Sequence, residues 1–217
     1  MGLVLDPSII YNFMTTHTLL GLLLKGGWLM LPLICLSITA VYIIVERLLI
    51  YRKYLNFSSS FLALIEEALN NGDFSKVKHI CTDQDNIIQK VISKGIAERQ
   101  TSNVPLILES VSSKIIAYLE GRLSLLATIS GVAPMIGFLG TVTGMIQTFM
   151  AISQQNHHIA SHLFSSGIYE AMVTTVAGLI VGIIAYLGYN YCIARVNKAV
   201  ATLSYVVNLF LARVKSL

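Results

Sequence analysis

Charged residues are nearly absent from residues 123–194, where Glu170 is the single Asp, Glu, Lys or Arg. Over the whole chain only 12% of residues are charged and 55% are hydrophobic, and the mean hydropathy is +0.71. Soluble domains carry about 25% charged residues, so this composition excludes an ordinary soluble globule. The segment contains two apolar runs, each long enough for a helix that crosses a bilayer, which needs about 20 residues.

Other residue types and motifs are also scarce or absent, and each absence excludes a class of function. Cysteine occurs only at positions 35, 81 and 192, a spacing that fits neither a disulfide framework nor a metal site. Basic residues do not gather with aromatic ones, so we expect no nucleic-acid partner. Residues 1–24 contain no Lys or Arg, which argues against a cleavable signal peptide. No motif for a cofactor is present, and we expect none.

A further apolar run begins at Trp28, and the basic residues near the span ends set the orientation. They lie mainly after the first span, before the second and after the third, so the positive-inside rule places these flanks in the cytoplasm. We therefore expect an all-α membrane protein with an external amino terminus and a cytoplasmic carboxyl terminus. The expected parts are an external segment with a short interfacial helix at 1–27, transmembrane helices at 28–50, 123–152 and 168–191, a cytoplasmic helical domain at 51–122, an external loop at 153–167 and a cytoplasmic helix at 192–217.

The cytoplasmic domain shows helical periodicity. Apolar residues recur at helical spacing over 61–69 and 87–96, and Asn70-Asn71-Gly72 indicates a turn after the first of these. Pro105 suits an early helical position. From Ile107 one apolar stripe continues into the second span, which predicts a single helix of more than about 40 residues. The apolar pattern of the tail likewise predicts an extension of the third span.

Small and hydroxyl residues recur along one face of the second and of the third span. In the second span they are Pro134, Gly137, Thr141, Gly144 and Thr148, and in the third Ala171, Thr175, Gly178, Gly182 and Ala185. Such stripes allow close packing of helices in lipid, which is one interpretation. The other is a hydrated proton path, because Pro134 frees the carbonyl of Ser130 and Glu170 lies one turn before Thr174. A charged residue in a span is by default a functional candidate.

The candidate residues therefore form two sets. The proton-path set is Thr141, Thr148, Glu170, Thr174 and Thr175, and the set that shapes and packs the helices is Pro134, Gly137, Gly140, Gly144, Gly178 and Gly182. No titratable group lies at the expected midplane, so either the chain conducts nothing or a partner supplies the acid. His157, His158 and His162 suit a zinc or pH-sensing site, but a polar external loop is the simpler interpretation. An intramembrane protease is disfavoured because no serine has a nucleophile-elbow context.

Three segments carry a resemblance to a known family. They are Leu126-Ala127-Thr128-Ile129, Ala133-Pro134-Met135-Ile136-Gly137-Phe138-Leu139-Gly140-Thr141-Val142-Thr143-Gly144-Met145-Ile146, and Gly167-Ile168-Tyr169-Glu170-Ala171-Met172-Val173-Thr174-Thr175-Val176-Ala177-Gly178-Leu179. These segments resemble the MotA/TolQ/ExbB proton-channel family, and ExbB most closely. The Gly-Thr-Val-Thr-Gly run favours ExbB over TolQ, and the short cytoplasmic segment disfavours a flagellar stator of the MotA type.

The resemblance implies a homopentamer in the bacterial inner membrane, with its external side in the periplasm and a central pore that holds a dimer of a single-span, ExbD-like partner. That partner carries the midplane aspartate, which Thr141 and Thr175 would face, while Glu170 would lie near the periplasmic mouth. ExbB-type complexes use the proton motive force to energise TonB, which drives uptake of iron chelates or vitamin B12. Such a subunit is no enzyme. A TolQ-like role in the Tol-Pal envelope system and a passive scaffold subunit stay open as alternatives.

Overall fold

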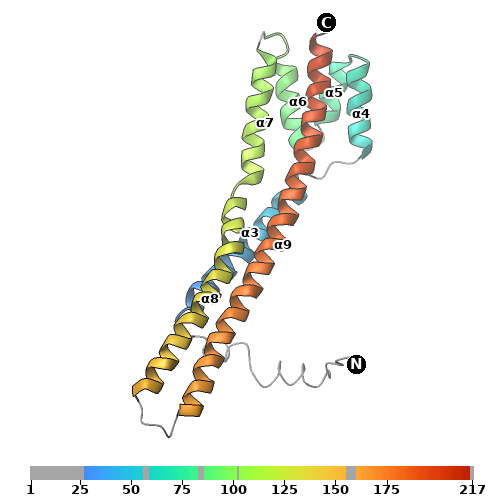
Figure 1. Cartoon of the computed structure of the whole chain (residues 1–217). Coiled ribbons are helices and arrows are strands. Elements are labelled where there is room, and N and C mark those ends of the chain that lie inside the picture. The colour runs from blue at the N-terminus through green and yellow to red at the C-terminus, as the bar shows by residue number, and fades with distance from the viewer. Residues whose placement is uncertain (1–26, 56–58, 83–85, 102, 155–159, 216–217) are drawn as a thin grey trace, which may run out of the picture. The chain divides into compact units, whose positions relative to one another are not determined.

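The computed structural model describes residues 27–55, 59–82, 86–101, 103–154 and 160–215, and this part of the chain contains helices and no strand (Figure 1). The expected all-α class is therefore confirmed over these ranges. The interfacial helix expected at 1–27 lies outside them, apart from Gly27. The helices are α3 (Met30–Tyr54), α4 (Ser59–Asn70), α5 (Phe74–Thr82), α6 (Ile87–Ala97), α7 (Val104–Glu120), α8 (Leu123–Gln154) and α9 (Ala160–Lys215).

Three segments are long and apolar enough to cross a membrane, namely Met30–Tyr54, Val104–Met150 and Gly167–Val214. Many of their large apolar side chains are exposed, for example Leu31, Phe138 and Ile183. Exposed apolar surface of this extent is unfavourable in water but is the normal surface of a helix in lipid. The chain is thus a membrane protein with three apolar helical segments.

One compact unit comprises the first half of α3, α8 from Leu126 and α9 up to Leu187. Its small core contains Met30, Leu33 and Ala133, with Val173 and Ala177 packed against them. The three helices therefore contact one another through apolar side chains near the start of α3. This unit holds all the residues of the two candidate sets.

The second unit comprises residues 42–125 and 188–217, which include α4 to α7 and the later parts of α3 and α9. Buried apolar residues from all these helices form one large core, in which the Phe74 and Phe210 rings meet edge to face at 5.9 Å. A Cβ at Gly95 of α6 would lie 3.0 Å from side-chain atoms of Leu108 and Phe210. Glycine at this position therefore lets α6 pack closely on α7 and α9.

Local signals explain the ends of the short helices. Gly72 has φ +73 in the turn after α4, a conformation that glycine adopts without strain. Asp73 Oδ1 then accepts a hydrogen bond from the backbone N–H of Lys76 at 2.9 Å, and Asn86 Oδ1 accepts one from Gln89 at 2.9 Å. Both are N-terminal caps, which satisfy backbone donors that a helix leaves unpaired.

The expectation of a single helix that runs from residue 107 into the second span is wrong. α7 ends at Glu120 and α8 begins at Leu123, and Arg122 between them has φ 63, in the left-handed region. A bulky residue rarely adopts this conformation unless other contacts hold it there. Those contacts come from α3: Arg47 and Tyr51 donate hydrogen bonds to carbonyl oxygens at the end of α7.

Candidate functional site

The face between α8 and α9 is built from residues without large side chains. Along it, Pro134 lies opposite Gly182, Gly137 opposite Gly178, Gly140 opposite Thr174, and Gly144 opposite Ala171. A Cβ at Gly178 would lie 2.6 Å from the carbonyl oxygen of Ala133, and one at Gly140 would lie 2.7 Å from Cγ2 of Thr174. The stripes of small residues thus pair the second and third spans of one chain, with backbones too close for side chains between them.

Pro134 lies inside α8, where its ring leaves the carbonyl of Ser130 without its usual N–H donor. α9 presents Gly182 at this level: a Cβ there would lie 2.5 Å from Cγ of Pro134 and 3.1 Å from the carbonyl oxygen of Ser130. The absent side chain of Gly182 therefore makes room for the proline ring and brings the α9 backbone up to the freed carbonyl.

The threonines of this face are held by hydrogen bonds to backbone oxygens. Thr175 Oγ1 on α9 donates to the carbonyl oxygen of Gly137 on α8 at 2.8 Å, which links the two helices directly. Thr148 Oγ1 donates to Gly144 O at 2.8 Å and lies against Gly167. Thr174 is 2% exposed and packs on Gly140. Among the described side chains of α9, Thr174 is thus the most buried residue with a hydroxyl, while the stripe found in the sequence contains its neighbour Thr175.

Thr141 lies away from this contact. Its hydroxyl donates to the carbonyl oxygen of Phe138 in its own helix at 2.6 Å, and its side chain is half-exposed. Thr141 and Thr175 therefore flank Gly137, Thr141 from one turn along α8 and Thr175 from across the helix pair. The hydrogens of both hydroxyls are already donated, so both oxygens are left to accept a hydrogen bond from a group outside the chain.

The buried Thr174 is one of the residues that line a cavity of about 20 Å³. Thr143 and Gln147 of α8 supply further polar groups around it, and Trp28, two residues before α3, also lines it. A cavity of this size, with several polar partners, is sufficient for one water molecule. Sequence reasoning did not select Thr143 or Gln147; the available signal was the position of a glutamine, a rare residue in an apolar span.

Some of the residues selected from the sequence are outside the described side chains. Glu170 lies within α9, one turn before Thr174, but its side chain is among those that the structure leaves undescribed. His157 and His158 are outside the described residues, and so is the side chain of His162. Within the described ranges no group of three or more His, Cys, Asp or Glu residues is placed to hold a metal ion. The roles of these residues stay predictions.

The described part of the α8–α9 face offers hydroxyl and carbonyl oxygens but no titratable side chain. Hydroxyls and an ordered water can relay or solvate a proton, yet they do not hold one near neutral pH. A proton that crosses at this level therefore needs a carboxylate, an imidazole or another titratable group from elsewhere. The described part of the face therefore supplies hydrogen-bond acceptors for a proton but no group that holds one.

The known proteins that are similar to this chain belong to one class. Residues 83–204 match the model of the MotA/TolQ/ExbB proton channel family. A putative biopolymer transport protein ExbB homolog from Methanothermobacter thermautotrophicus is 29% identical over 199 residues, covering 90% of this chain and 69% of that protein. The putative biopolymer transport protein ExbB-like 1 from Synechocystis is 32% identical over 197 residues, 88% of this chain and 77% of that protein. The Tol-Pal system protein TolQ from Haemophilus influenzae is 33% identical over 125 residues, covering 58% of this chain and 49% of that protein.

Proposed function

Because this chain belongs to the MotA/TolQ/ExbB proton channel family, we propose that it is the stator subunit of an ExbB–ExbD-type motor in the bacterial inner membrane. In this proposal the subunit forms a homopentamer, and its central pore holds a dimer of a single-span, ExbD-like partner. The amino terminus lies in the periplasm and the carboxyl terminus in the cytoplasm. The motor uses the proton motive force to act on a TonB-like protein and so energises uptake of iron chelates or vitamin B12 across the outer membrane.

The observation that carries the proposal is the hydrogen bond from Thr175 Oγ1 to the carbonyl oxygen of Gly137. It fixes a hydroxyl oxygen in the middle of an apolar helix pair, with its hydrogen turned inward to α8 and its lone pairs available. A protonated carboxyl of a partner can donate to such an oxygen, and Thr141 provides a second acceptor one helical turn away. Residues 123–194 contain no acid besides Glu170, so the partner must supply the carboxylate that carries the proton.

Glu170 has a separate place in this proposal. It lies beyond Thr174 towards the external end of the third span, where it would meet protons before they reach the hydroxyls. The cavity beside Thr174 would hold water between these two levels. Protons would thus pass from the periplasm by way of Glu170 and water to the partner's carboxylate at the level of Thr141 and Thr175.

A second candidate function follows from the relatives, since a TolQ protein of the Tol-Pal system also matches more than half of this chain. A TolQ-like subunit would have the same pore chemistry but would act on envelope integrity instead of uptake. A passive scaffold, in which the stripes only pack helices, is the third candidate. The glycine contacts between α8 and α9 are compatible with all three, so the partner decides among them.

The test is purification of the tagged full-length protein from its own membranes in mild detergent, followed by native mass spectrometry. We expect a pentamer that holds a dimer of a small single-span protein with an aspartate in its span. Replacement of that aspartate by asparagine should abolish proton flux in reconstituted vesicles and leave the complex intact. Recovery of this chain without such a partner would contradict the motor and favour the scaffold. Co-purification of a TolA-like protein would assign the Tol-Pal role, and co-purification of a TonB-like protein the uptake role.

A further inference from the structure

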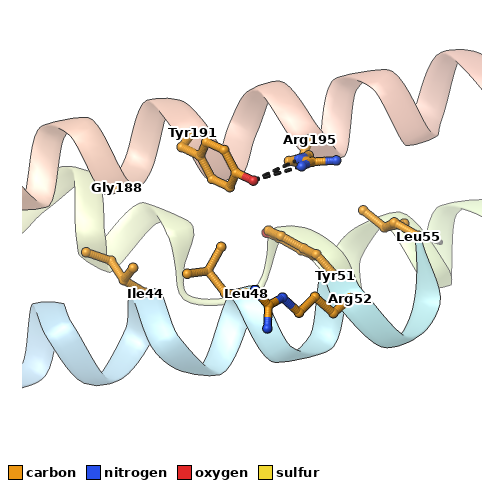
Figure 2. A pocket seen from close by; sticks show the side chains of 8 residues that line it. All are labelled: Ile44, Leu48, Tyr51, Arg52, Leu55, Gly188, Tyr191 and Arg195. Atoms are coloured by element: carbon orange, nitrogen blue, oxygen red, sulfur yellow. Dashed lines mark hydrogen bonds between the residues drawn. The ribbon is translucent and has the colours of Figure 1, made fainter.

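A large cavity lies between the later parts of α3 and α9 (Figure 2). Its volume is about 760 Å³, within the roughly 300–1,000 Å³ typical of small-molecule sites. Ile44 and Leu48 of α3 and Leu55, directly after its end, form an apolar wall. In Figure 2, Tyr191 and Arg195 on α9 face Ile44 and Leu48 across the space. The cavity belongs to the second unit and contains no residue of the candidate proton path.

Two of the residues that line the cavity, Arg52 and Arg195, carry positive charge. Arg195 donates from Nε and Nη2 to the Tyr191 hydroxyl at 3.1 and 2.9 Å, and its guanidinium lies 5.3 Å from the centre of that ring. Arg52 lines the cavity from α3. In the described part of the chain neither arginine forms an ion pair with a carboxylate, and no acidic residue lines the cavity. The guanidinium of Arg195 is thus held in place by a neutral partner.

The cavity lies where the apolar spans end. Arg52 follows the apolar stretch of α3, and Arg195 is the first charged residue after Glu170 along α9. Arginine and tyrosine at such positions lie at the level of the lipid head groups. Ile44 and Leu48 lie one to two helical turns before Arg52 on α3, so the apolar wall extends from Arg52 back towards the membrane span.

We propose that this cavity binds one anionic phospholipid, with the phosphate between Arg52 and Arg195 and an acyl chain along Ile44 and Leu48. Guanidinium groups bind phosphate through charge-assisted, often bidentate hydrogen bonds. Basic pockets between transmembrane helices at the membrane surface are sites of this kind for lipid head groups. The apolar wall beside the two arginines selects a lipid over free inorganic phosphate. The proposal does not depend on proton conduction or on any partner protein.

The test compares lipids on the purified full-length protein by native mass spectrometry. Delipidated protein is titrated with phosphatidylglycerol, with phosphatidylcholine of the same acyl chains, and with inorganic phosphate. We expect one tight phosphatidylglycerol per chain, bound at least about tenfold more strongly than phosphatidylcholine, because basic residues near the membrane surface attract anionic lipids. Equal binding of the two lipids would overturn the proposal. Binding of inorganic phosphate with no preference for phosphatidylglycerol would overturn the assignment of a lipid.

Matched variants locate the site. The double variant Arg52→Gln/Arg195→Gln should lose the preference, whereas Lys53→Gln/Lys198→Gln, which removes the same charge from the same two helices outside the cavity, should keep it. If both double variants lost the preference for phosphatidylglycerol equally, the lipid would be bound by general charge attraction and the proposal would be overturned. Leu48→Trp fills the cavity but retains both arginines, so it should also abolish tight binding. If Leu48→Trp instead breaks an oligomer while the lipid preference survives, a neighbouring subunit fills the cavity and the proposal is wrong.

Discussion

Arg47 of α3 donates a hydrogen bond from Nη1 to the backbone carbonyl oxygen of Tyr118 at 2.8 Å, at the last turn of α7. Next to it, the Tyr51 hydroxyl donates to the carbonyl oxygen of Leu119 at 3.0 Å. The last carbonyls of a helix have no partner within the helix, and here α3 supplies the donors from far away in the sequence. The break between α7 and α8 is therefore a stabilised feature of the fold.

The charges around this break are linked. Glu46 Oε2 accepts a hydrogen bond from Arg122 Nη1 at 2.6 Å, and Glu46 Oε1 lies 3.7 Å from Nη2 of Arg47. Arg47 is only 4% exposed, and its Nε has no hydrogen-bond partner among the described residues. The carboxylate of Glu46 thus contacts both Arg47, which caps α7, and Arg122, whose backbone is left-handed.

Replacement of Arg47 tests this arrangement. Arg47→Met keeps an apolar stem but leaves the Tyr118 carbonyl unpaired, so we expect a loss of about 1–3 kcal/mol in unfolding free energy. Arg47→Lys keeps the charge and should recover part of the loss. Lys53→Met, an exposed lysine of the same helix, is the control. The measurement is thermal unfolding in detergent followed by circular dichroism. Equal stability of Arg47→Met and Lys53→Met would show that the cap is not important.

Gly178 tests the packing of α8 on α9. Gly178→Leu places bulk where a Cβ alone would lie 2.6 Å from the Ala133 carbonyl oxygen, and overpacking costs about 1–3 kcal/mol or more. We expect loss of thermal stability and of the assembled oligomer, and Gly137→Leu should behave alike. Gly131→Leu is the matched control, because a Cβ at Gly131 has nothing within 4 Å. An intact complex of Gly178→Leu in native mass spectrometry, as stable as Gly131→Leu, would refute this packing.

These two cases show what the sequence predicts and what it misses. The stripes of small residues predicted close helix packing, but neighbouring residues differ by only about 100° around a helix. Which of Thr174 and Thr175 is buried therefore depends on how α9 is rotated against α8. The break at Arg122 depends on donors from Arg47 and Tyr51, which are distant in the sequence and leave no local signal. Helix α5 was missed because it is short and charged, and it is held by Phe74, Val77 and Cys81 in the core.

Thr175→Val tests the proposed proton path. The substitution keeps the shape of the side chain and removes the hydroxyl that bonds Gly137, a loss of about 0.6–2 kcal/mol in a membrane helix pair. We expect the complex to assemble while transport that depends on the proton motive force collapses. Thr141→Val should behave likewise. Thr39→Val removes a comparable hydroxyl from α3, where it bonds Cys35 O, and should transport normally. Normal uptake by a stably assembled Thr175→Val would remove this hydroxyl from the path.

Cys81 provides a pH test of the second unit, outside the membrane spans. Burial raises the pKa of its thiol to about 11, from an ordinary value of 9.0. The unfolded chain ionises first, so the stabilisation from burying the neutral thiol is complete below about pH 9 and is lost as the pH rises towards 11. The loss is at most about 1.4 kcal/mol per pH unit. We expect wild type to lose more stability than Cys81→Ala between pH 9 and 11 in denaturant unfolding. Parallel curves would contradict a buried neutral thiol.

Glu170 lies on α9, one turn before Thr174, and replacing it tests whether it collects protons. If it collects protons, it must exchange one, since each charge that moves through 100 mV releases about 2.3 kcal/mol. Glu170→Gln keeps the length and a carbonyl oxygen but cannot exchange a proton, so we expect assembly with the partner and poor uptake. Glu170→Ala should also loosen the assembly. Glu109→Gln on α7 is the control for loss of one carboxylate, and it should transport normally. Wild-type, proton-motive-force-dependent uptake by Glu170→Gln would make the residue a structural acceptor, and the path would then depend on the threonines and the partner's acid alone.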